Sequence, residues 1–144
     1  MAITVKEIEL WRTEAQNQPG VLAATLAPLA NAGSDLQIVM GYRYPGNETK
    51  AAIEVFPVKG KKPTAAAESA GLKPTAIPTL LIEGDNKPGL GHSIADGLAG
   101  AGINISFLMA QVIKGRYSAV IGFEAAGDAK KAVPLIKKAA AKRK

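Results

Sequence analysis

The chain of 144 residues contains no cysteine and a single histidine, His92. Without cysteine it cannot form a disulfide, supply a thiolate nucleophile or build a cysteine-based zinc site. A lone histidine also has no second imidazole with which to share a metal ion. The sequence therefore predicts a protein with no disulfide framework and with no resident metal or other cofactor.

Long apolar runs are also missing. The longest mostly apolar segment, AGINISFLMAQVI, is interrupted by Asn, Ser and Gln, and a bilayer-spanning helix needs about 20 apolar residues. The first residues, MAITVKEIEL, lack the basic segment and the apolar stretch of a secretory signal. We therefore expect a cytoplasmic protein that does not enter the membrane.

An excess of positive charge is absent from most of the chain, although the net charge is +6. Residues 130–144 hold seven of the 18 Lys and Arg residues and none of the 12 acidic ones. Such a basic end is typical of a solvated helix terminus, where cations complement the helix dipole. The alternative is an arm that binds nucleic acid. We favour the solvated helix end and do not expect nucleic acid as a partner.

Two segments of the chain are similar enough to indicate an internal repeat. NQPGVLAATLAPLANAGSDL (17–36) and NKPGLGHSIADGLAGAGINI (86–105) begin 69 residues apart and agree at seven of twenty positions. A repeat of this kind indicates two structural units built on one plan, and a lone unit of this size is only marginally stable. The repeat predicts two units, residues 1–77 and residues 78–144.

Both halves predict the same order of elements, from apolar alternation in strands and from Pro and Gly at their boundaries. The first half predicts a strand over 3–12 with a bulge near Lys6 and Glu7, a helix over 20–31, strands over 36–44 and 49–58, a helix over 63–70 and a strand over 72–77. The second half predicts strands over 79–84, 103–113 and 117–124 and helices over 88–101 and 128–141. The second half lacks an obvious last strand.

This order predicts an α+β fold of two ferredoxin-like βαββαβ units, each an antiparallel sheet with its helices on one face. The sheet edge left by the missing strand needs cover, either from the other unit or from a second chain. Because each small unit has surface that it cannot bury alone, we also expect the chain to form a homodimer.

Each repeat places Asn-x-Pro-Gly between a strand and a helix, and this pattern suits the binding of an amino acid. Proline and glycine allow a sharp turn that leaves the backbone uncovered. The N–H groups that follow lie at the positive end of a helix, which attracts a carboxylate. The asparagine offers both a donor and an acceptor. The alternative is that the asparagine only caps the helix and Pro-Gly only makes the turn.

The motif is followed by a helix with Leu-Ala and Ala-Gly and, in the second repeat, by Ile-Asn-Ile. This sequence resembles the ACT domain in two tandem copies, over about residues 3–77 and 78–141. The resemblance implies an amino-acid effector site between paired domains, formed by the loop after the first strand and the start of the second. The implied residues are Asn86, Gly89, Leu90, Gly91, His92 and Asn104 in the second repeat and Asn17, Gly20, Val21, Leu22 and Asp35 in the first.

Three of these positions need separate comment. Asp35 replaces the usual asparagine, so it adds a negative charge that either pairs with an ammonium or repels a carboxylate. Gly91 stands where the family has a large aliphatic residue, so it either opens room for a ligand or weakens the helix by about 1 kcal/mol relative to alanine. His92 either contacts a ligand or is an ordinary surface histidine. Because Asn104 is retained, the second repeat is the better predicted site.

These features predict a regulatory or sensor protein that binds an amino acid and has no catalytic residues. The alternative is a regulatory subunit that transmits amino-acid binding to a separate metabolic enzyme. An RNA-binding protein is disfavoured, because Arg116 and Ser118 stand where the third strand would need aromatics that stack on bases. An enzyme is disfavoured as well, since no general acid, base or nucleophile stands in a recognisable setting.

Overall fold

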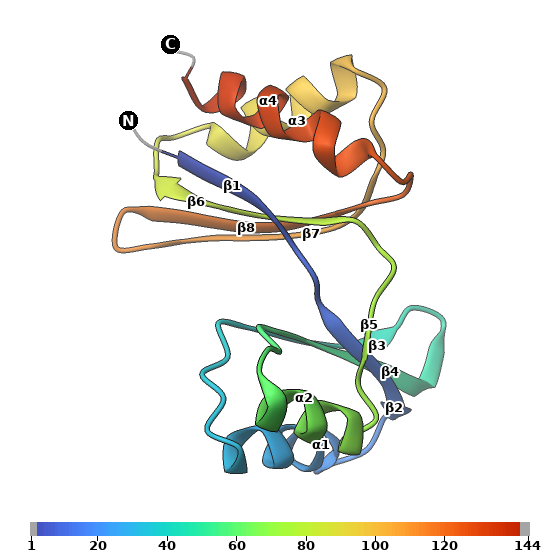
Figure 1. Ribbon diagram of the computed structural model, residues 1–144. Coiled ribbons are helices and arrows are strands. Elements are labelled where there is room, and N and C mark those ends of the chain that lie inside the picture. The colour runs from blue at the N-terminus through green and yellow to red at the C-terminus, as the bar shows by residue number, and fades with distance from the viewer. Residues whose placement is uncertain (1–2, 142–144) are drawn as a thin grey trace. The chain divides into compact units, whose positions relative to one another are not determined.

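The computed structural model describes residues 3–141, which form eight strands and four helices. They make two units, each with a four-stranded antiparallel sheet and two helices on one face of it (Figure 1). The predicted fold class is confirmed. Lys142, Arg143 and Lys144 of the basic end lie outside the described residues. None of the described helices is long and apolar enough to cross a membrane.

The unit of the first repeat comprises residues 9–76. Its strands are β2 (Trp11–Gln16), β3 (Ile38–Tyr44), β4 (Asn47–Phe56) and the short β5 (Lys73–Pro74), in the sheet order β3-β4-β2-β5. Its helices are α1 (Val21–Asn31) and α2 (Lys61–Ser69). Because β4 pairs with β3 on one side and with β2 on the other, β3 lies at the edge of the sheet.

Apolar side chains from the sheet and from both helices form the core of this unit. Ile53 and Val55 alternate along β4, as expected for a strand with one face on a core. They pack in one cluster with Trp11 of β2, Leu29 of α1 and Ala67 of α2. Burying each large apolar side chain stabilises the fold by about 1.5–3 kcal/mol, so this cluster holds α1 against the sheet.

The unit of the second repeat comprises residues 77–141 together with 3–8. Its strands are β1 (Ile3–Ile8), β6 (Thr79–Asp85), β7 (Ile105–Ile113) and β8 (Arg116–Phe123), in the sheet order β1-β6-β8-β7. Its helices are α3 (Leu90–Gly100) and α4 (Asp128–Ala141). Leu98 of α3 and Ile136 of α4 are fully buried in its core.

β1 supplies the strand that the second repeat lacks. It runs antiparallel to β6, with Ile3 opposite Gly84 and Ile8 opposite Thr79. The half-buried side chains of Ile3 and Val5 pack against the core of this unit. The sheet edge that the second repeat leaves open is therefore covered from within the same chain.

The prediction of one strand over residues 3–12 with a bulge near Lys6 and Glu7 is wrong. The strand ends at Ile8, and the next begins at Trp11 in the other sheet. Val5 faces the core of one unit and Trp11 faces the core of the other. The change of parity in the apolar pattern marks a change of sheet. The repeat predicts a first unit over residues 1–77, whereas β1 belongs to the compact unit of the second repeat.

Candidate functional site

The Asn-Gln-Pro-Gly loop of the first repeat lies between the end of β2 and the start of α1. The backbone N–H of Asn17 donates to the carbonyl of Thr49 at 2.9 Å, and its side-chain Nδ2 donates to the carbonyl of Glu48 at 2.8 Å. These two bonds tie the loop to the start of β4. No side chain in the described residues caps α1, so Asn17 holds the loop to the sheet and does not cap the helix.

Gly20 makes the turn into α1. Its φ of 90° lies in the left-handed region, which residues with a side chain rarely adopt. Gly89 has the same conformation at the start of α3, with a φ of 84°. The two loops therefore share one backbone turn, and each depends on glycine for it.

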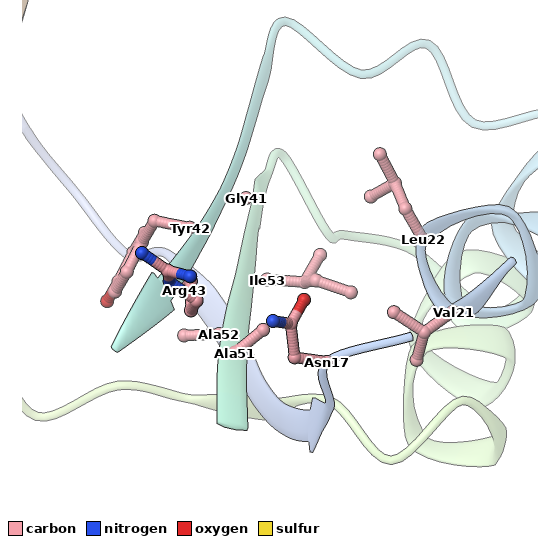
Figure 2. A pocket seen from close by; sticks show the side chains of 9 residues that line it. All are labelled: Asn17, Val21, Leu22, Gly41, Tyr42, Arg43, Ala51, Ala52 and Ile53. Atoms are coloured by element: carbon pink, nitrogen blue, oxygen red, sulfur yellow. The ribbon is translucent and has the colours of Figure 1, made fainter. Parts of the chain in front are cut away.

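A cavity of about 250 Å³ opens beside this loop, between the start of α1 and strands β3 and β4. Three of the predicted residues line it: Asn17, Val21 and Leu22. The strands contribute Gly41, Tyr42, Arg43, Ala51, Ala52 and Ile53 (Figure 2). Asp35 is not among these lining residues and lies exposed in the segment between α1 and β3.

Most of the wall of this cavity is apolar. Leu22 extends from α1 with 43% of its surface exposed, which is high for a large apolar side chain. Gly41 lies opposite Ile53 in the strand pairing, and a Cβ added to Gly41 would meet no atom within 4 Å. The missing side chain of Gly41 therefore leaves open space over the sheet beside α1.

Asn17 and Arg43 supply polar groups at the cavity, and both contact Glu48. Arg43 Nη1 lies 4.0 Å from Oε1 of Glu48, whose carbonyl accepts the bond from Asn17. Both side chains of this ion pair are well exposed, so it contributes little to stability. The guanidinium is consequently free to take another carboxylate.

The corresponding loop of the second repeat is held by a backbone hydrogen bond of the same kind. The N–H of Asn86 donates to the carbonyl of Gly115 at 2.9 Å, as Asn17 does to the start of β4. Leu90 follows Gly89 and is buried in the core against the sheet. Its side chain is therefore turned away from any ligand at the start of α3.

Tyr117 occupies the space beside the start of α3. By the repeat offset, Arg43 corresponds to Val112. Arg43 pairs with Ala51 across β3 and β4, and Val112 pairs with Tyr117 across β7 and β8. Tyr117 is only 6% exposed, and its burial raises the pKa of its hydroxyl. That hydroxyl lies 3.7 Å from the point that a Cβ on Gly91 would occupy, so Gly91 leaves room for a tyrosine of the same chain.

The other predicted residues of the second repeat lie on the surface. His92 is exposed in the first turn of α3, and Asn104 is exposed just before β7. The carbonyl of Asn104 accepts the N–H of Glu124 at 3.5 Å. Within residues 3–141, no three histidine or acidic side chains gather into a group that could hold a metal ion.

The sequence matches no protein-family model and no curated protein. Its structure, however, is similar to solved structures. A protein from Bacteroides thetaiotaomicron superposes with a TM-score of 0.72 at 16% identity, over 93% of this chain and 89% of that one. The ligand-free regulatory subunit of aspartate kinase from Thermus thermophilus superposes with a TM-score of 0.64 at 20% identity, over 96% of this chain and 97% of that one.

E. coli aspartokinase III, solved in complex with aspartate and ADP, gives a TM-score of 0.61 at 13% identity, over 96% of this chain and 33% of that one. The chain has the tandem ACT-like fold. Sequence identities of 20% and below show the shared fold alone.

The sequence did not predict the cavity-lining residues that β3 and β4 contribute in this ACT-like unit. The lining residues Gly41, Arg43 and Ala51 belong to β3 and β4, beyond the conspicuous Asn-x-Pro-Gly motif. A sequence signal existed for Arg43, which is a charged residue where the second repeat has Val112. The equivalence of Ala51 to Tyr117 follows only from the strand pairing.

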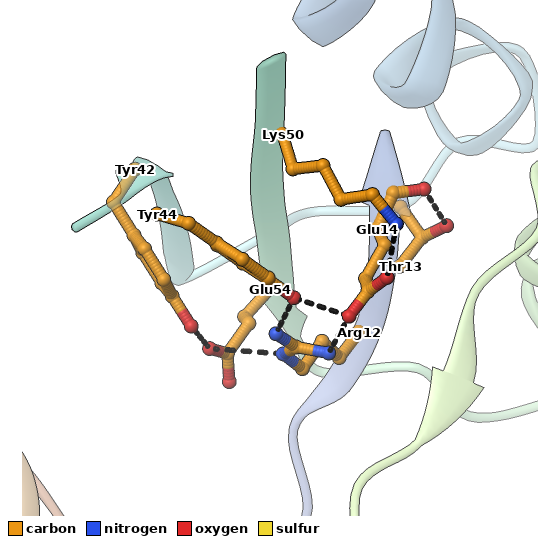
Figure 3. Close-up of polar contacts among 7 residues, drawn as sticks. All are labelled: Arg12, Thr13, Glu14, Tyr42, Tyr44, Lys50 and Glu54. Carbon is orange, nitrogen blue, oxygen red and sulfur yellow. Dashed lines mark hydrogen bonds and ion pairs between the residues drawn. The ribbon is translucent and has the colours of Figure 1, made fainter. Parts of the chain in front are cut away.

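A cluster of polar side chains lies on the same sheet as the cavity (Figure 3). Glu54 is buried, accepts a hydrogen bond from the Tyr42 hydroxyl at 2.8 Å and lies 3.8 Å from Arg12 Nε. Glu14 accepts a hydrogen bond from the Tyr44 hydroxyl at 2.5 Å. Arg12 donates to Tyr44 and lies 3.8 Å from Glu14. Side chains of β2, β3 and β4 are thus joined in one network.

The network changes the acidity of its members. Burial, followed by the bond to Glu54, raises the pKa of the Tyr42 hydroxyl. The hydrogen bond from Tyr44 is the main cause that lowers the pKa of Glu14. Burial alone would lower the pKa of Arg12, but its bonds to the two tyrosines raise it above the ordinary value. The charged forms of Arg12 and Glu14 are therefore the favoured ones.

Proposed function

We propose that this protein is a regulatory protein that binds a free amino acid and is not an enzyme. The observation that carries the proposal is the cavity of about 250 Å³ at the first repeat, which Asn17, Val21 and Leu22 line. Pockets for drug-sized ligands span about 300–1,000 Å³, so this cavity is of a size for a smaller molecule such as an amino acid.

The chemistry of Asn17 supports an amino acid as the ligand. Its Nδ2 is used in the bond to the Glu48 carbonyl, which fixes the side-chain amide in one orientation. Its Oδ1 remains an acceptor, and an ammonium group is a donor only. We assign the ligand's ammonium to this oxygen. For the second repeat, the exposed Asn104 and His92 beside Gly89 remain a proposal of the same kind.

A regulatory role is supported by the solved structures of similar length. The Thermus thermophilus protein is a regulatory subunit of aspartate kinase, and this chain covers 97% of it. A second candidate function is therefore a regulatory subunit that transmits amino-acid binding to a separate metabolic enzyme. In either role we propose a cytoplasmic homodimer.

A thermal-shift screen against the twenty amino acids tests the proposed function. Binding to the folded state raises its stability by about 2.7 kcal/mol when the ligand is at 100 times the dissociation constant. We expect at least one amino acid to raise the melting temperature of the wild-type chain. The shift should shrink in Asn17→Ala and persist in the matched variant Asn31→Ala, since Asn31 is exposed at the end of α1. No shift with any of the twenty would contradict the proposal.

A further inference from the structure

We infer that the cavity of the first repeat selects an amino acid with an uncharged, apolar side chain, and that Arg43 binds its carboxylate. The inference rests on the proposed function, because it names the class of amino acid for the same site. It also assigns Tyr117 as the side chain that fills the equivalent space in the second repeat.

The wall of the cavity favours an apolar side chain. Val21 and Leu22 approach from α1, and Ala51 and Ile53 from β4. The surface left exposed on Leu22 is apolar area that a ligand side chain can remove from water, which is favourable in proportion to the area buried. Among the described residues that line the cavity, no side chain is a carboxylate. The lining side chains therefore offer no partner for the charge of a lysine or arginine ligand.

Arg43 is the cationic side chain among the described lining residues. Its contact with the exposed Glu48 is a long one of 4.0 Å, so a ligand carboxylate can replace Glu48 at low cost. A guanidinium can bind a carboxylate through two parallel hydrogen bonds, which are stronger than neutral ones. Arg43 therefore accounts for recognition of the carboxylate.

Asn17 and Arg43 both reach Glu48, one at its carbonyl and the other at its side chain. These two polar groups therefore converge on one residue. An amino acid carries its ammonium and its carboxylate on the same carbon, so a ligand at Asn17 brings its carboxylate to the side where Arg43 lies. The ligand's side chain is then left for the apolar wall.

The second repeat lacks both features. Val112 stands where Arg43 stands in the first repeat, so the cation is missing. Tyr117 stands where the first repeat has Ala51, with its hydroxyl 3.7 Å from the Cβ position of Gly91. The exchange of Leu22 for Gly91 compensates for the added tyrosine volume. The first repeat therefore has an open cavity beside its first helix, and in the second repeat Tyr117 fills the equivalent space.

Titration calorimetry with valine, leucine, aspartate and lysine tests the ligand class on the full chain. We expect valine and leucine to bind. The dissociation constants of aspartate and lysine should be at least about tenfold higher. Tighter binding of aspartate or lysine would overturn this inference while leaving the proposed function in place. Binding by none of the twenty amino acids in the thermal-shift screen would overturn both.

The role of Arg43 is tested by comparing valine with valinamide, in which a neutral amide replaces the carboxylate. Arg43→Ala should weaken valine binding more than about tenfold, as expected for the loss of a hydrogen bond between charged groups. It should leave the affinity for valinamide unchanged. The matched variant Arg116→Ala removes an equally exposed arginine that pairs with Asp85, and it should bind valine as the wild type does. An equal loss of both ligands in Arg43→Ala would overturn the assignment.

The location of the site is tested by Gly41→Val. A Cβ at Gly41 meets no atom within 4 Å, so the strand has room for the start of a side chain there, and we expect valine to fill part of the cavity. We expect this variant to melt as the wild type does without ligand and to lose valine binding. Unchanged affinity in a folded Gly41→Val variant would show that the ligand binds elsewhere.

Discussion

Ala51 and Tyr117 occupy equivalent positions in the two repeats, and this single difference in side-chain size distinguishes the two units. The small side chain leaves a cavity beside α1, whereas the large one is buried beside the start of α3. At the neighbouring position the sizes are reversed, because the first repeat has the large Leu22 and the second has Gly91. In the second repeat the small Gly91 therefore offsets the volume added by Tyr117, as a close-packed interior requires.

The hydrogen bond from Tyr44 to Glu14 predicts how the pKa of a single carboxyl group responds to a substitution. The bond favours the charged carboxylate, so the pKa of Glu14 is lowered in the folded chain. A group with a lowered folded pKa contributes stability above its ordinary pKa, and this contribution is lost as the pH falls toward the lowered value. Tyr44→Phe removes the donor, so the pKa of Glu14 should rise toward its ordinary value. Carbon-detected NMR titration of the Glu14 carboxyl measures the change.

A second tyrosine provides the control for this prediction. Tyr42 donates to Glu54 and not to Glu14, so Tyr42→Phe should leave the pKa of Glu14 nearly where it is in the wild type. The same shift in both variants, or none in Tyr44→Phe, would show that the Tyr44 hydrogen bond is not what lowers this pKa.

At the scale of elements, the sequence predicts most helices and strands to within a few residues but misplaces the first strand. Apolar alternation is local, so it shows where residues 3–12 change parity and cannot show which sheet each part joins. The partner of β1 is β6, more than 70 residues further along the chain. The Asn-x-Pro-Gly loop was found because its proline and glycine are visible in the sequence. Arg43 and Gly41 were missed because only the strand pairing brings them to that loop.

The role of β1 in the second unit can be measured with two substitutions on one strand. Val5 packs against the core of that unit, whereas its neighbour Thr4 is exposed. Val5→Asn should lower the free energy of unfolding by about 1–3 kcal/mol, because a polar group then replaces half-buried apolar surface. Thr4→Asn should change it by less than about 0.5 kcal/mol. Urea denaturation gives both values, and equal effects would mean that β1 contributes no packing.

For the whole molecule, the most relevant exposed apolar feature is strand β7. It lies at the edge of its sheet and is nine residues long. Leu108, Val112 and Ile113 along it are 49%, 50% and 56% exposed. A long apolar edge strand readily pairs with another strand. An antiparallel pair of identical strands has two-fold symmetry, so the homodimer proposed above can form through this edge.

Val112→Lys tests whether this edge forms the proposed homodimer. We expect the wild-type chain to sediment as a dimer at tens of micromolar. A lysine on a paired edge would be buried without a partner, which is costly, so the dimer should dissociate about tenfold more readily or worse, a loss of at least about 1.4 kcal/mol. Ala99→Lys adds the same charge at an exposed position of α3 and should leave the dimer intact. A monomeric wild type would refute the dimer, and equal dissociation of both variants would place its interface away from β7.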